Sequence, residues 1–218
     1  MEVFLLVTVA WVFSVCLHEF GHAAVAFKGG DYTVQEKGYL TLNPMRYTHP
    51  VFSLVMPLVF LLLGGIGLPG GAVYINDHLL RSRGWRTATS LAGPAMNILL
   101  ALVLCLPFWL GVLDSEHAGM IARALAFLIQ LQISAVFLNL LPVPPLDGFQ
   151  ALSPWLPPEV RAKLLEHSTV AIWVLFLVMW YVPAANHAFW SSVFAVTHLL
   201  GISPELGLQG WREYQFWR

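Results

Sequence analysis

Residues 3–27 read VFLLVTVAWVFSVCLHEFGHAAVAF, an apolar run whose only ionisable side chains are His18, Glu19 and His22. A helix that crosses a bilayer needs roughly 17–25 mostly apolar residues, so this run is long enough to span a membrane. Ionisable side chains are costly at that depth, and where they occur they mark functional sites by default. The stretch therefore predicts a membrane helix with a polar site inside it.

Further apolar runs follow along the chain, and the last two are near the lower length limit for a span. The runs are Val51 to Leu68, Ala88 to Val112, Met120 to Leu141, Thr169 to Pro183 and Ala188 to Gly201. Together with residues 3–27 they predict an all-α polytopic membrane protein with about five or six membrane segments. We expect one domain over residues 1–218, in which 3–27, 88–112 and 120–148 form the core helices and 169–201 the C-terminal membrane segments.

The composition agrees with a membrane protein. Hydrophobic residues make up 58% of the 218 residues and charged residues only 11%, whereas an ordinary soluble domain has about 25% charged residues. This argues against a soluble enzyme, a disordered tail or a small secreted domain held by disulfides. The formal net charge of −1 offers no surface for nucleic acid. Cys16 and Cys105 both lie in apolar runs, which is typical of small buried hydrophobes rather than of a disulfide or a metal cluster.

The HEFGH motif has the spacing of a metal site. Residues four apart share one face of a helix, so His18 and His22 can bind one ion while Glu19 projects beside them. This is the arrangement of zinc hydrolases, in which two histidines bind the metal and the glutamate takes a proton from water. The alternative is that the three side chains only form hydrogen bonds with a neighbouring helix.

A catalytic zinc site needs a third protein ligand, and Asp147 is the best candidate. Of the four aspartates, Asp31, Asp77 and Asp114 lie in polar loops, where a solvated carboxylate is ordinary. Asp147 follows an apolar helix that the prolines of NLLPVPPLDG interrupt, and irregular backbone at membrane depth is tolerated only where protein or a water-filled cavity surrounds it. The alternative is that this carboxylate caps the next helix.

Residues 31–45 (DYTVQEKGYLTLNPM) contain two β-prone runs, Tyr32–Gln35 and Tyr39–Leu42. The polar residues between these runs predict a β-hairpin at the membrane surface. An edge of such a hairpin could hold an unwound peptide as an added strand.

Three motifs together resemble the signatures of the site-2 protease family of intramembrane zinc metalloproteases. They are HEFGH, SLAGPAMN (Ser90 to Asn97) and NLLPVPPLDG (Asn139 to Gly148). GYLTLNPMRYTHP (Gly38 to Pro50) resembles a loop of the compact bacterial and archaeal branch, which lacks PDZ and CBS domains. The sequence departs from that branch at His49, where an aspartate is usual, and at GAVYIND (71–77), which replaces a basic, proline-containing stretch.

The resemblance implies one zinc ion per chain, with His18, His22 and Asp147 as its ligands and Glu19 as the general base. It also implies that Asn139 contacts the substrate carbonyl or oxyanion. Asn97 and the Gly93-Pro94 pair match a closely packed helix start that faces the site. The activity implied is hydrolysis of peptide bonds in or near transmembrane segments of single-span substrates. A non-catalytic relative that binds membrane clients and a transporter remain alternatives. The substrate's identity and the oligomeric state stay open.

The positions of the motifs along the chain also constrain the topology, independently of the resemblance. For the three motifs to meet, the first helix must end, and the helix over 88–112 begin, at one face of the membrane, so residues 51–68 would be re-entrant. All lysines and arginines except Arg123 then fall on one side. The alternative is that 51–68 spans the membrane fully, which would give a weaker bias, with four basic residues on one side and seven on the other. The positive-inside rule places that side in the cytoplasm of a bacterial or archaeal cell. We therefore expect the N-terminus outside and the C-terminus and catalytic face inside.

Overall fold

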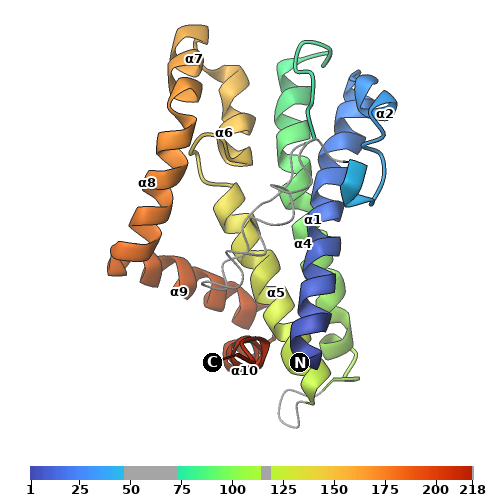
Figure 1. Ribbon diagram of the computed structural model, residues 1–218, viewed down its shortest axis with the longest axis vertical. Helices are drawn as coiled ribbons and strands as arrows, with labels where there is room; N and C mark the ends of the chain where they lie inside the picture. Colours follow the sequence, from blue (N-terminus) through green and yellow to red (C-terminus); the bar gives the residue numbers. More distant parts are fainter. Residues whose placement is uncertain (47–72, 114–118, 218) are drawn as a thin grey trace.

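The computed structural model describes residues 1–46, 73–113 and 119–217, and the regular elements in these ranges are all helical (Figure 1). The elements are α1 (Glu2–Gly29), α2 (Thr33–Glu36), the 3-10 turn η1 (Pro44–Arg46), α4 (Arg83–Trp109), α5 (Met120–Asn139), α6 (Asp147–Leu152), the 3-10 turn η2 (Ser153–Trp155), α7 (Pro158–Glu166), α8 (Ser168–Tyr181), α9 (Pro183–Leu199) and α10 (Pro204–Tyr214). The predicted all-α class is confirmed for the described ranges.

Three helices, α1, α4 and α5, are long and apolar enough to cross a membrane. A fourth span is formed if α7 and α8, which meet at 62°, are taken as one broken span. The expected five or six segments are therefore not found in the described part of the chain. The 14 residues of α8 extend only about 21 Å, less than the roughly 30 Å of a bilayer core. Helix α9 runs across the bundle rather than along it (Figure 1).

Helix α5 lies at the centre of the bundle, where it packs against α1, α4, α9 and α10. Its alanines at 122, 124, 126 and 135 are buried and let neighbouring backbones come close, which is how membrane helices pack. Larger side chains fill the space between α5 and α1, with Trp11 and Leu128 both almost fully buried. The core is thus arranged around the helix that leads to Asp147.

The end of α1 and the approach to α4 lie together. The Arg81 N–H donates a hydrogen bond of 3.0 Å to the carbonyl oxygen of Gly29. The chain between them therefore leaves and returns at one end of the bundle, as the motifs require. Residues 51–68, for which a re-entrant segment is predicted, lie outside the described residues.

The predicted hairpin over 31–45 is wrong, because its first run forms the single helical turn α2. The buried Asp31 explains this. Its Oδ1 accepts hydrogen bonds from the backbone N–H of Thr33 (3.1 Å) and the Thr33 hydroxyl (2.6 Å), which starts a helical turn. Its Oδ2 accepts from the Asn76 N–H at 2.7 Å. A local side-chain contact thus overrides the β-propensity of the run.

The two termini lie at the same end of the bundle, so an outside N-terminus with an inside C-terminus is also wrong (Figure 1). The ring of Phe4 lies 5.2 Å from those of Tyr214 and Phe216 and 6.0 Å from that of Trp217. The reason is that α9 turns across the bundle instead of returning along it, which leaves α10 beside the start of α1.

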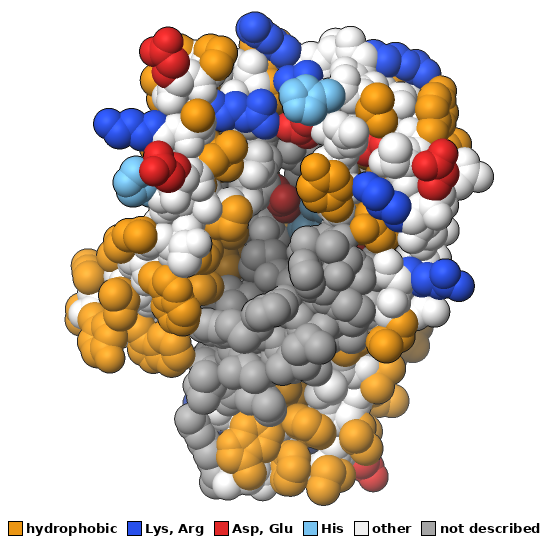
Figure 2. Space-filling view, turned by 45° about the horizontal axis from the view of Figure 1, so that its top comes forward, with side chains coloured by type: hydrophobic (Ala, Val, Ile, Leu, Met, Phe, Trp, Pro, Cys, Tyr) orange, Lys and Arg blue, Asp and Glu red, His pale blue; other side chains and the backbone are white. Residues whose placement is uncertain are grey.

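Basic side chains gather at the opposite end, where α1 ends and α4 begins. Figure 2 shows lysines and arginines concentrated at the top of the molecule, above an apolar lower part. Of the eleven basic residues, Arg218 is not described, and Arg123 and Arg212 lie at the end near α10. The other eight are Lys28, Lys37, Arg46, Arg81, Arg83, Arg86, Arg161 and Lys163.

This arrangement predicts the result of cysteine labelling in intact cells. Glu2→Cys and Glu205→Cys should react with a membrane-impermeant maleimide from one side, and Lys37→Cys and Glu159→Cys from the other. The buried native Cys16 and Cys105 provide little background. Labelling of Glu205→Cys from the same side as Lys37→Cys would contradict the fold.

Candidate metal centre

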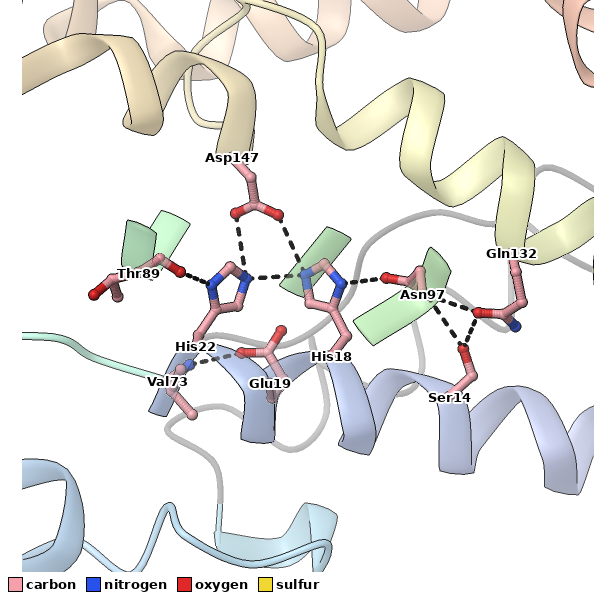
Figure 3. Close-up of polar contacts among 9 residues, drawn as sticks. All are labelled: Ser14, His18, Glu19, His22, Val73, Thr89, Asn97, Gln132 and Asp147. Carbon is pink, nitrogen blue, oxygen red and sulfur yellow. Dashed lines mark hydrogen bonds and ion pairs between the residues drawn. The ribbon is translucent and has the colours of Figure 1, made fainter. Parts of the chain in front are cut away.

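His18, His22 and Asp147 converge on one point (Figure 3). The two Nε2 atoms lie 3.0 Å apart, His18 Nε2 lies 3.2 Å from Asp147 Oδ2, and His22 Nε2 lies 3.4 Å from Asp147 Oδ1. A tetrahedral zinc ion with bonds of 2.0–2.1 Å holds its ligand atoms about 3.3 Å apart. The three side chains therefore have the spacing of ligands to one small metal ion.

The outer nitrogens of both imidazoles are bound to acceptors. His22 Nδ1 lies 2.7 Å from the carbonyl oxygen of Thr89, and His18 Nδ1 lies 2.5 Å from Oδ1 of Asn97. Each Nδ1 therefore carries the proton, which in a neutral imidazole leaves a lone pair on Nε2. Two lone pairs and a carboxylate then face one another, a set that a cation stabilises.

The neighbouring atoms also fit a metal ion. Asp147 Oδ2 is buried, and no hydrogen-bond donor reaches it within the described ranges. The alternative is that the two histidines only form hydrogen bonds with a neighbouring helix. Their Nδ1 atoms do form such bonds, with α4, but their Nε2 atoms still face the carboxylate. The His18 and His22 side chains are only 7% and 8% exposed, whereas that of Asp147 is 19% exposed. Among the three side chains, that of Asp147 is therefore the most accessible.

The break after α5 brings Asp147 to the centre. Helix α5 ends at Asn139, and the chain turns back so closely that a Cβ on Gly148 would overlap the Leu140 carbonyl. Leu146 is the N-cap of α6 and Asp147 is its first helical residue, with a carboxylate that faces the two imidazoles. The alternative, in which it caps α6, is therefore wrong.

Helix α4 covers the same centre at Gly93. A Cβ at this position would overlap Nε2 of both His18 and His22. Only a residue without a side chain lets α4 approach the imidazoles this closely. The close packing that the resemblance implies for Gly93-Pro94 is therefore present in the structure.

Glu19 lies beside the two histidines and is 4% exposed. Its Oε2 accepts a hydrogen bond of 3.1 Å from the backbone N–H of Val73, and Figure 3 shows its carboxylate between the two imidazoles. Val73 could not be predicted from the sequence, because its backbone N–H makes the contact and every residue except proline has such a donor.

Asn139 is buried at the end of α5, and its Nδ2 has no hydrogen-bond acceptor in the described ranges. No contact between described residues joins it to His18, His22 or Asp147, so its role stays a prediction. His49 lies outside the described residues.

Two polar residues were missed from the sequence, Ser14 and Gln132, which contact Asn97 near the histidines. A glutamine within the apolar run of 120–141 is a signal that could have identified one of them.

These observations define a class, that of helical membrane proteins with a buried two-histidine, one-carboxylate metal centre and an adjacent glutamate. Three relatives are each named "Putative zinc metalloprotease". Rip2 of Mycolicibacterium smegmatis is 43% identical over 218 residues, 99% of this chain and 82% of the relative. Rip2 of Mycobacterium tuberculosis is 44% identical over 215 residues, again 99% and 82%. YwhC of Bacillus subtilis is 31% identical over 185 residues, 82% and 81%.

The chain belongs to this family of zinc metalloproteases. No family model matches the chain, and no solved structure matches it. The family supplies zinc as the expected metal, and His18, His22 and Asp147 could hold it.

Gly93 offers a direct test of the centre. Gly93→Ala should lower the zinc affinity by about tenfold or more, because the added methyl group would displace both Nε2 atoms, and loss of ligand orientation costs at least that much. Gly84→Ala on the same helix is the matched control, since its Cβ would meet only Ser82 Oγ at 3.6 Å. Affinity is measured by chelator competition and folding by thermal unfolding. Equal zinc affinity in the two variants would contradict the geometry.

Proposed function

We propose that the protein is an intramembrane zinc metalloprotease of the site-2 type, which hydrolyses peptide bonds in or near transmembrane segments. The observation that carries the proposal is the placement of His18, Glu19 and His22 on α1, a helix long and apolar enough to cross a membrane. A soluble metalloprotease has no need for such a helix. Ionisable groups within one are costly and mark a function at that depth.

His18, His22 and Asp147 would hold the zinc ion, which when bound supplies Lewis acidity toward a peptide carbonyl. Glu19 is the general base that takes the proton from the attacking water and passes it to the leaving amine. Its position supports this role, because the Val73 N–H fixes one carboxylate oxygen beside the imidazoles. A fixed base loses little freedom in the reaction and keeps its orientation.

Asn139 is the proposed donor to the substrate carbonyl oxygen as negative charge develops there. Its amide Nδ2 is buried and has no acceptor among the described residues, which suits a donor whose partner arrives with the substrate. Docking of the substrate on a hairpin over 31–45 is not part of the proposal, because that hairpin does not form.

Single-span membrane proteins are the proposed substrates. A transmembrane helix hides its carbonyl groups in its own hydrogen bonds, so a stretch of the substrate must unwind before it is cut. Asp147 has the most exposed side chain of the three proposed ligands. The unwound backbone would enter from the side of Asp147.

The proposed location is the cell membrane of a bacterium or archaeon, with the catalytic end toward the cytoplasm. The positive-inside rule supports this orientation, because eight described basic residues lie at the catalytic end and two at the other. Both termini then lie outside the cytoplasm.

Glu19→Gln tests the function. The variant should retain zinc, because position 19 is not a ligand, and should lose cleavage of a single-span substrate by at least about 100-fold, the lower end of general-base effects. The side-chain amide oxygen of the variant can still accept the Val73 hydrogen bond, so the fold is kept. Zinc content and product formation are measured on the same purified samples.

Glu36→Gln is the matched control, because Glu36 is exposed on α2 and distant in sequence from the motif. It should cleave like the wild type. Equal cleavage by the Glu19→Gln and wild-type proteins would exclude Glu19 as the base. Zinc binding without cleavage by the wild type, over a panel of single-span substrates, would favour a non-catalytic relative.

A further inference from the structure

Gln132 is a fully buried amide in the middle of the apolar helix α5. Its Oε1 accepts two hydrogen bonds, from Asn97 Nδ2 at 2.7 Å and from the Ser14 hydroxyl at 2.8 Å. These three residues come from three different helices, α5, α4 and α1. They form a buried polar network next to the candidate metal centre (Figure 3).

The network reaches His18 through the other end of the Asn97 amide. An asparagine side chain has one donor group and one acceptor oxygen. Because Nδ2 of Asn97 is bound to Gln132, its Oδ1 is the atom that faces His18 Nδ1, at 2.5 Å. His18 Nδ1 must then carry a proton, and the Nε2 lone pair is free for a metal ion.

The reverse orientation of Asn97 would disable the ligand. With Nδ2 turned toward His18, the imidazole would have to accept at Nδ1 and carry its proton on Nε2. A protonated Nε2 cannot bind a metal ion, because its lone pair is used. The orientation of one amide thus decides whether His18 can bind metal.

His22 does not need such a network. Its Nδ1 donates to the backbone carbonyl of Thr89, and a carbonyl held in a helix cannot exchange donor for acceptor. A side-chain amide can rotate by 180° and exchange the two. His18 is therefore the ligand whose tautomer depends on a further contact.

The side-chain oxygen of Gln132, and not its nitrogen, makes the hydrogen bonds of the network. Its Nε2 is buried and has no hydrogen-bond acceptor in the described ranges. An unpaired buried donor is unfavourable, and an apolar side chain of the same length would avoid it. The amide at 132 therefore adds an acceptor for Asn97 and Ser14 at a cost in stability.

We propose that Gln132, assisted by Ser14, is a positioning residue for metal binding: it fixes the Asn97 amide, which sets the Nδ1–H tautomer of His18 and leaves Nε2 free for zinc. This deepens the proposed function, since it assigns residues that prepare the same centre. Both residues would act through Asn97 rather than as ligands.

The test uses the purified full chain and measures metal binding, not only activity. Gln132→Met removes the acceptor while nearly keeping the side-chain volume. Gln130→Met is the matched control, because Gln130 is also buried on α5 but donates to the Pro204 carbonyl at 2.9 Å, away from the centre. Zinc affinity is measured by chelator competition, the Co²⁺ spectrum by absorption and folding by thermal unfolding.

We expect Gln132→Met to lower zinc affinity by about tenfold and to alter the Co²⁺ d–d bands, the lower end of the effect of losing a residue that contacts a metal ligand directly, as Asn97 does. Ser14→Ala should lower affinity by about threefold, because the bond between Asn97 and Gln132 remains. Gln132→Glu, which keeps an acceptor oxygen, should restore most of the affinity. Gln130→Met should lower the unfolding temperature and leave zinc affinity unchanged.

The proposal is overturned if Gln132→Met binds zinc as tightly as Gln130→Met, or if Gln132→Glu binds as weakly as Gln132→Met. A normal zinc affinity in Gln132→Met, together with loss of cleavage in Glu19→Gln, would refute the positioning role and leave the proposed function intact. A wild-type chain that binds no zinc would refute both.

Discussion

Two imidazoles and one carboxylate converge inside an apolar bundle, and the packing of the three long helices is arranged to keep them there. The three contacts among these groups are short: the two Nε2 atoms of His18 and His22 lie 3.0 Å apart, and each lies 3.2–3.4 Å from an oxygen of Asp147. Such groups repel one another and lose hydration when buried, so only a cation or protons can hold them together. The helices around this cluster must therefore leave room for its side chains and supply their hydrogen-bond partners.

Three features of the fold serve this cluster. α1 continues past the histidines to Gly29, so that both imidazoles and Glu19 keep helical spacing. α4 comes close enough at Gly93 to confine the imidazoles, and its Thr89 and Asn97 bind their outer nitrogens. The chain breaks after α5 and turns back at Gly148, which brings the carboxylate. Each of these three features positions a candidate ligand or its hydrogen-bond partner.

The errors of prediction have physical causes of two kinds. In 31–45 a short-range effect was missed, because the Asp31 carboxylate binds Thr33 and Asn76 and so favours a helical turn over a strand. In 169–201 a long-range effect was missed: α9 lies across the bundle, and the C-terminal residues therefore lie beside Phe4. Hydropathy indicates that a segment avoids water, but it does not specify whether the helix lies along the bundle or across it.

Residue types were enough to predict a membrane protein, its three long helices and its candidate metal ligands. Apolar length, helical spacing and the scarcity of ionisable residues at membrane depth are properties that residue types carry locally. Tertiary packing is what brings Asp147 to face the histidines, Val73 N–H to Glu19 and Gln132 Oε1 to Asn97. These contacts join residues that are far apart in the sequence, and two of them involve a backbone amide or the orientation of a side-chain amide. No local pattern specifies such partners, because they are set by how the helices pack.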